Sequence, residues 1–86
     1  MSARDYMAQK LREAREAKGL TQKEVGDAVG RSFRTVSAWE RSDGAQPDAD
    51  MLIMLCVLYE VPISYFYEPK YQYMYMKLDG DEDDAQ

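Results

Sequence analysis

The run Gly30-Arg31-Ser32-Phe33-Arg34 places two guanidinium groups, a hydroxyl and an aromatic ring within five residues. A guanidinium can donate two parallel hydrogen bonds, and the O6 and N7 atoms of guanine are the commonest specific acceptors of such a pair in the major groove of DNA. The ring of Phe33 could rest on thymine methyl groups. The run favours contact with bases, although Arg34 could instead be a solvated residue and Phe33 could fold back onto the core.

Covalent chemistry has no comparable support in the sequence. The chain has no His and one Cys. This composition excludes a disulfide framework, a Cys/His zinc site and the Ser-His-Asp or Cys-His groups of hydrolases. Because no nucleophile, base and cofactor motif converge, we expect no enzyme activity, no cofactor and no metal.

The charge is divided unevenly along the chain. Residues 1–47 carry nine Lys and Arg against seven Asp and Glu, whereas residues 79–86 carry five acids and no base. Such asymmetry is typical of a nucleic-acid-binding face joined to an acidic tail. A solvated surface with a solubilising tail would have the same pattern, and on charge alone we prefer that interpretation.

We expect a cytoplasmic protein without a membrane segment. A single Cys fits a reducing compartment, and the charged N-terminus does not have the pattern of a signal peptide. The longest apolar run, MLIMLCVLY, has nine residues. A run of this length is too short to cross a bilayer.

Hydrophobic spacing and capping residues predict five short helices. They are expected over residues 3–18, 21–29, 33–41, 49–59 and 65–68. Thr21 and Glu24 have the spacing of a capping box, while Ser32 and Ser64 are the expected caps of the third and fifth helices. Beyond Pro69, the stretch KYQYMYMKL alternates as a strand does.

Two glycines and four apolar residues at fixed spacing predict that the second and third helices form a helix-turn-helix. At Gly26 a large side chain would hold the two helices apart, and at Gly30 the turn needs a positive φ, which is cheap only for glycine. The apolar residues that would attach both helices to the core are Val25, Val29, Val36 and Trp39. In this motif the second helix projects its N-terminal residues outward.

These segments resemble the Cro/repressor-type (XRE-like) helix-turn-helix family of phage and bacterial regulators. The matching stretches are LREAREAKGLTQKEVGDAVG, SFRTVSAWER and the apolar spacing from Pro47 to Phe66, all within residues 8–68. The resemblance implies an all-α fold, a compact five-helix domain like that of lambda repressor. It also implies that the domain binds duplex DNA as a dimer.

The resemblance assigns roles to individual residues. Positions that match the family's base contacts are Phe33, Arg34 and Ser37, with Ala38 behind them, and those that match its phosphate contacts are Gln22 and Ser32. Flanking positive charge would make binding dependent on salt. The candidate DNA-binding residues are therefore Gln22, Lys23, Arg31, Ser32, Phe33, Arg34, Thr35, Ser37, Ala38 and Arg41. Arg15 and Glu40 match a family ion pair that ties the first helix to the third, which we interpret as structural.

Two positions depart from the family pattern. The Gly usually found just after WER is Ser42 here, with Gly44 two residues later. We therefore expect a shifted exit from the third helix. Gly26 stands where Ala is more usual, which weakens the second helix slightly.

The predicted helix over residues 49–59 has apolar residues on every side, as in a helix that is buried all round. Met51, Met54 and Val57 stand where relatives usually carry polar, outward residues. We expect an arm formed by residues 70–78, a second protomer, or both to cover this helix. The residues assigned to this packing are Met51, Met54, Val57, Tyr71, Tyr73, Met74, Tyr75 and Met76.

The chain is thus expected to divide into a DNA-binding domain (1–69), a Tyr/Met-rich arm (70–78) that is a candidate dimerisation strand, and a disordered acidic tail (79–86). The leading hypothesis is a homodimeric, sequence-specific regulator of transcription, of the repressor type found in phages and mobile elements. Antitoxins and restriction-controller proteins use the same domain. An alternative from another class is a protein-interaction module that binds a protein partner through helix 49–59 and the arm.

Overall fold

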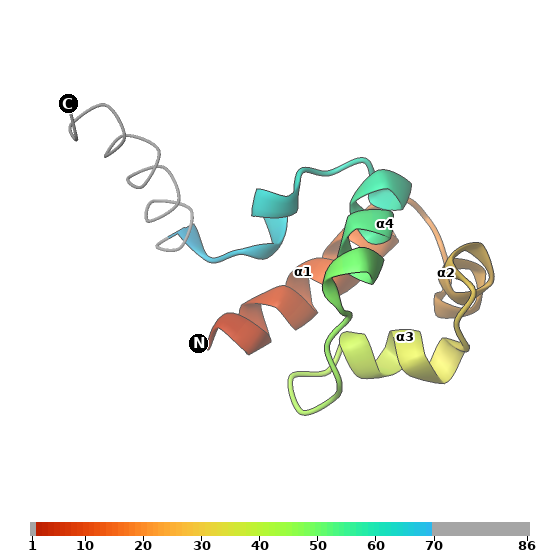
Figure 1. The fold of residues 1–86 in the computed structure, drawn as a ribbon, viewed down its shortest axis with the longest axis horizontal. Helices are drawn as coiled ribbons and strands as arrows, with labels where there is room; N and C mark the ends of the chain where they lie inside the picture. Colours follow the sequence, from red (N-terminus) through yellow and green to blue (C-terminus); the bar gives the residue numbers. More distant parts are fainter. Residues whose placement is uncertain (1, 70–86) are drawn as a thin grey trace.

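Four α-helices and one 3-10 helix build the part of the chain that the computed structural model describes, residues 2–69. They are α1 (Ala3–Ala17), α2 (Gln22–Val29), α3 (Phe33–Trp39), α4 (Ala49–Tyr59) and the 3-10 helix η1 (Ile63–Phe66). In Figure 1, α2 and α3 lie together on one side of the molecule, α4 runs through the middle, and η1 lies on the other side. The predicted arm (70–78) and tail (79–86) lie outside the described residues.

Each α-helix begins where a side chain accepts a hydrogen bond from a backbone amide in the first turn. The four caps are Ser2, Thr21, Ser32 and Asp48. The predicted capping box is present, since the Glu24 amide donates to Thr21 Oγ1 at 3.0 Å and the Thr21 amide donates to the Glu24 carboxylate at 2.8 Å. Each cap contributes about 0.5–2 kcal/mol, so local chemistry defines where these helices start.

The fifth predicted element differs from its prediction. Instead of an α-helix over residues 65–68 capped by Ser64, the chain forms the 3-10 helix η1, with Pro62 at its N-cap and no side-chain cap. The Tyr65 amide donates to the Pro62 carbonyl at 3.0 Å, three residues back. Short segments adopt this tighter pattern readily, and Pro69 leaves no room for a longer helix.

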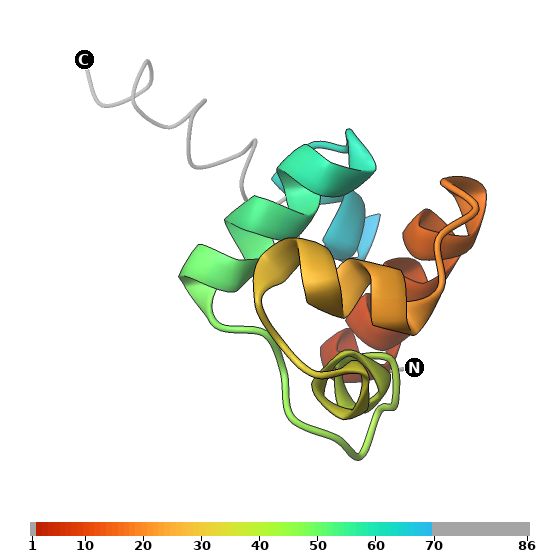
Figure 2. The same cartoon turned by 90° about the vertical axis from the view of Figure 1, so that its right-hand side faces the viewer.

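One continuous core joins the helices. Its buried members are Leu11, Ala14, Val25, Val29, Val36, Trp39, Met51, Leu52, Leu55, Tyr59 and Phe66. The four apolar positions expected to attach the helix-turn-helix are all among them. In Figure 2, α2 crosses the view while α3 is seen end-on below it, so the two helices meet at a steep angle over this core.

The prediction that Met51 lies on an outward face of α4 is wrong. Met51 is only 4% exposed and packs in the core with Leu55 and Tyr59. These residues are four positions apart, so they form one stripe on the helix. The outward apolar face of α4 instead consists of Ile53, which is 58% exposed, together with Met54 and Val57.

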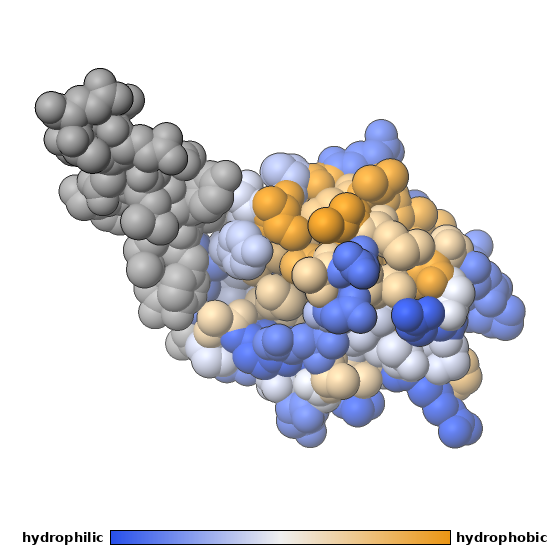
Figure 3. All heavy atoms as spheres, viewed as in Figure 1, coloured by the Kyte–Doolittle hydropathy of each residue, from blue (hydrophilic) through white to orange (hydrophobic). Residues whose placement is uncertain are grey.

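The outward face of α4 is part of a larger apolar surface. In Figure 3, hydrophobic residues gather over α4, while hydrophilic residues cover most of the lower part of the same view. Within the described residues 2–69, no helix is both long enough and apolar enough to span a membrane.

Candidate nucleic-acid interface

Backbone packing in the turn between α2 and α3 sets the direction in which α3 runs. Gly30 ends α2 with φ at 75°, in the left-handed region, and the Arg31 amide donates to the Gly26 carbonyl at 2.8 Å. A Cβ atom at Gly26 would lie 2.4 Å from the Arg31 carbonyl oxygen. The close contact of Gly26 is therefore with the turn itself, and the Ala that is usual in the family would not fit without a shift of the backbone.

The first turn of α3 presents two of the candidate residues to solvent. Ser32 caps the helix by accepting from the Thr35 amide at 3.3 Å. Phe33 does not fold back onto the core, because it is 52% exposed. The guanidinium carbon of Arg34 lies 5.9 Å from the centre of the Phe33 ring, which is within the range of a cation–π contact.

The remaining candidates surround this turn. Lys23, Arg31, Ser32, Arg34 and Arg41 are exposed, and Gln22, Thr35, Ser37 and Ala38 are half-buried. The cations have only local partners, since Lys23 pairs with Asp27 at 3.0 Å and Arg41 with Asp43 at 3.5 Å. Exposed pairs of this kind contribute little to stability.

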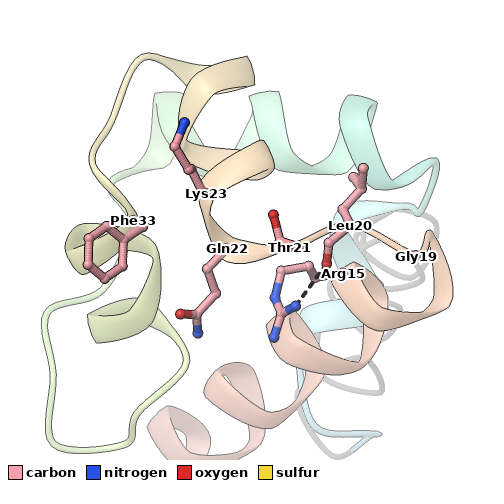
Figure 4. A pocket seen from close by; sticks show the side chains of 7 residues that line it. All are labelled: Arg15, Gly19, Leu20, Thr21, Gln22, Lys23 and Phe33. Atoms are coloured by element: carbon pink, nitrogen blue, oxygen red, sulfur yellow. Dashed lines mark hydrogen bonds between the residues drawn. The ribbon is translucent and has the colours of Figure 1, made fainter.

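A shallow depression of about 580 Å³ lies beside the start of α2. Its lining residues are Arg15, Gly19, Leu20, Thr21, Gln22, Lys23 and Phe33. Figure 4 shows Phe33 extending from α3 while Lys23 extends from α2, with Gln22 between α3 and Arg15. The depression thus combines an aromatic ring, a cation and the N-terminal end of a helix, where partial positive charge favours anions.

Arg15 and Glu40 join α1 to the end of α3 below this depression. Arg15 Nε and Nη2 donate to the Glu40 carboxylate at 2.8 and 3.0 Å, and Nη1 donates to the Leu20 carbonyl at 2.8 Å. The side chains are only 12% and 4% exposed, so this is not a solvated surface pair. The hydrogen bond to Glu40 raises the pKa of Arg15 above its usual value.

Gln22 belongs to the same network. Its amide nitrogen donates to Glu40 at 3.1 Å. Burial raises the pKa of Tyr59 far above its usual range, and the Glu40 carboxylate raises it further. The network therefore fixes the position of the Gln22 side chain, a predicted phosphate contact, at the protein surface.

Arg4 makes tertiary contacts within the protein that sequence patterns do not identify. It lies in the first turn of α1, and its guanidinium donates to backbone carbonyls at the end of α3 and in the loop that follows. The nearest of these partners in sequence is 34 residues away. No cap, spacing or periodicity signals so distant a contact.

A family model described as helix-turn-helix matches residues 11–66. The chain belongs to the Cro/repressor-type, XRE-like helix-turn-helix family. Over 59 residues it is 37% identical to the HTH-type transcriptional regulator ImmR of Bacillus subtilis (strain 168), a match that covers 69% of this chain and 46% of that relative. This helix-turn-helix chain thus spans about half the length of the curated relative.

Solved structures contain the same helical arrangement. The cobalt(II) form of HppE in complex with substrate has a TM-score of 0.71, 22% identity, and coverage of 79% of this chain and 38% of its own. The iron(II) form of HppE also has a TM-score of 0.71 at 22% identity, covering 79% of this chain and 35% of its own. At this identity the similarity shows the fold alone, here as one part of a longer chain.

Proposed function

We propose that this helix-turn-helix protein is a transcriptional regulator of repressor type that recognises a specific duplex DNA sequence with α3 in the major groove. The observation that carries the proposal is the two-sided character of α3. Val36 and Trp39 anchor it in the core, while Phe33 and Arg34 are exposed at its first turn. A helix anchored in this way fits the docking geometry in which N-terminal residues of the recognition helix contact base edges.

Arg34 supplies the main base-specific contact in this proposal. Its guanidinium would donate two hydrogen bonds to guanine O6 and N7, a contact that discriminates against a wrong base by about 1–3 kcal/mol. The cation–π contact with Phe33 holds the two side chains together on the exposed surface. Phe33 would then rest on the methyl group of a neighbouring thymine.

Phosphate contacts would supply most of the affinity. Lys23, Arg31 and Arg41 are exposed on α2, in the turn and after α3, so they flank the base-reading residues on both sides. Each phosphate that a cation neutralises releases counterions, which makes binding weaken steeply as salt rises. The protein acts by occupying its site and performs no reaction of its own.

A second copy of the chain would cover the apolar face of α4. A groove of about 560 Å³ lies there, lined by Ala49, Leu52, Ile53, Cys56, Val57, Val61, Pro62, Ile63 and Tyr67. The described chain ends two residues beyond Tyr67, and seventeen residues follow, beginning with the Tyr/Met-rich stretch KYQYMYMKL. Two copies that pair here would join these apolar segments and leave both α3 helices free for two half-sites.

Selection of binding sites from a random duplex library at about 0.15 M salt tests the DNA-binding proposal. We expect enrichment of a palindrome whose half-sites are about one helical turn apart. Arg34→Ala should lose preference at one base pair of each half-site, whereas Arg12→Ala, which changes an exposed residue on α1, should retain it. Weak binding without enrichment would refute the proposal.

Analytical ultracentrifugation tests the pairing surface. Val57 is 74% exposed, so Val57→Glu should leave the fold intact while it places a charge in the interface. We expect a dimer for the wild type and a monomer with unchanged helical content for the variant. A wild type that is monomeric at micromolar concentration would exclude pairing through this face.

The same groove supports a second candidate function, a protein-interaction module. The observation that favours it is the large apolar face of α4 on a chain whose net charge is −5. In that case Val57→Glu would abolish binding to the partner protein, and Arg34→Ala would have no effect on it. The regulator proposal predicts instead that Arg34→Ala lowers the affinity for DNA. An antitoxin or restriction-controller role would use the same DNA contacts.

A further inference from the structure

The guanidinium of Arg4 lies among five backbone carbonyl oxygens at the end of α3. Arg4 Nη2 donates to Arg41 and Gly44 at 2.8 Å and to Ala45 at 3.0 Å. Longer contacts of 3.4 Å reach the carbonyls of Ala38 and Trp39. One side chain from α1 therefore holds both the last turn of α3 and the loop that follows it.

Arg4 lies where a positive charge stabilises the C-terminal end of α3. The last carbonyls of a helix lack partners within the helix and form the negative end of its dipole. Within Phe33–Trp39 there is no basic residue in the last turn to offset this charge. Arg4 supplies the missing cation. The two N–H groups of Nη2 are shared among the carbonyls of Ala38, Arg41, Gly44 and Ala45, and Nη1 donates to that of Trp39.

The loop after α3 folds tightly against the helix end around this cation. A Cβ atom at Gly44 would lie 2.1 Å from the Ala38 carbonyl oxygen, so only glycine fits. The Gly44 amide donates to the Arg41 carbonyl at 3.1 Å. This packing makes residues 38–45 one unit centred on the Arg4 guanidinium.

The turn of α1 that carries Arg4 is fixed by its own cap. The Ser2 amide donates to the Asp5 carboxylate at 3.2 Å, and the Asp5 amide donates to Ser2 Oγ at 3.1 Å. Hydrogen bonding with Ser2 lowers the pKa of Asp5 below its usual value.

We infer that Arg4 is a positioning residue for DNA binding: it fixes the exit of α3 so that the Arg41 side chain reaches a phosphate beside the recognition helix. The carbonyl of Arg41 is held by Arg4, while its side chain is 60% exposed. This inference rests on the proposed function, because a phosphate contact requires that the protein binds DNA. Arg4 itself faces the protein backbone and touches no nucleic acid in this arrangement.

The test compares Arg4→Met with Arg12→Met, because both remove one positive charge from α1 and Arg12 is exposed. Affinity for the selected duplex is measured at several salt concentrations, well below the thermal midpoint of each protein. The slope of log affinity against log salt is negative, and we expect Arg4→Met to reduce its magnitude by about 0.9 for each protomer, the effect of one lost phosphate contact. Arg12→Met should retain the wild-type slope, and Arg4→Lys should restore part of the loss.

A double-variant comparison separates positioning from general destabilisation. Arg41→Gln alone should reduce the magnitude of the salt slope by the same amount. Arg4→Met together with Arg41→Gln should reduce it no further. Without DNA, the Gly44 amide should exchange its hydrogen faster in Arg4→Met but not in Arg12→Met.

The outcomes distinguish this inference from the proposed function. If the wild type selects a duplex and Arg4→Met retains its full salt slope, the positioning role of Arg4 is refuted while the regulator proposal stands. Additive slopes for Arg4→Met and Arg41→Gln would likewise refute it. If the wild type binds no duplex, the regulator proposal fails and the positioning role fails with it, whatever the Gly44 exchange rate shows.

Discussion

Replacing Arg15 with Met should destabilise the domain by about 3–5 kcal/mol, because it leaves a buried carboxylate without its cation. The Glu40 side chain is 4% exposed and accepts two hydrogen bonds from Arg15, at 2.8 and 3.0 Å. In the variant, the remaining donor is the Gln22 amide, at 3.1 Å. One neutral hydrogen bond does not compensate a desolvated charge.

A loss of this size is large for a chain of this length. A chain of 86 residues has a total stability of about 4–13 kcal/mol on the usual scale per residue. Each kcal/mol lowers the melting temperature of such a domain by about 4–8 °C. Arg15→Met should therefore lower the thermal midpoint by at least about 12 °C.

A double-mutant cycle isolates the pair from the other contacts of Arg15. Denaturant unfolding is measured for the wild type, Arg15→Met, Glu40→Gln and the double variant, at one protein concentration because self-association would shift the stability. The lost hydrogen bond to the Leu20 carbonyl is common to Arg15→Met and the double variant, so it cancels. Glu40→Gln keeps an acceptor for Gln22.

We expect the double variant to be more stable than the sum of the single changes predicts by about 2 kcal/mol or more, since removing both charges leaves nothing unpaired. Arg12→Met, an exposed change on the same helix, should alter stability by less than about 0.5 kcal/mol. Single effects that add within about 0.5 kcal/mol would refute the reasoning that this pair is coupled and buried.

Three further predictions concern the loop, the end of α4 and the thiol. Gly44→Ala should lower stability by about 1–3 kcal/mol, because its Cβ would lie 2.1 Å from the Ala38 carbonyl oxygen; an unchanged melting temperature would contradict this. Glu60→Gly should raise stability by about 0.5–1 kcal/mol, because Glu60 has φ at 58° and its exposed ion pair with Lys18 contributes little; a lower midpoint would show that the ion pair outweighs the backbone strain. Burial raises the pKa of the Cys56 thiol, so less thiolate is present at pH 8 and iodoacetamide should react more slowly than with free cysteine. A rate equal to that of free cysteine would show that the Cys56 thiol is accessible and that its pKa is not raised.

Signals confined to a few residues made the helix starts predictable. Thr21 and Glu24 are three residues apart, and each satisfies the backbone amide of the other, so the capping box needs no distant partner. Gly30 was predictable because the positive φ of the turn disfavours every residue with a Cβ. The spacing of Val36 and Trp39 likewise places both on one side of α3 before any tertiary contact is known.

Predictions that needed a distant partner were less accurate. On α4 nearly every residue is apolar, so hydropathy could not distinguish the buried Met51 from the exposed Ile53, and only the position of the other helices decided which side faces the core. The close approach at Gly26 depends on the path of the Arg31 carbonyl. The 3-10 form of η1 depends on Pro62 and on the docking of Phe66 in the core.

By itself the sequence determined the helix-turn-helix and its caps, because caps, turns and apolar spacing act over three or four residues. Tertiary structure alone decided that Arg4 holds the end of α3 and which side of α4 stays exposed. Those contacts join residues 34 or more positions apart, or depend on how the helices pack. Local residue patterns carry no information about either.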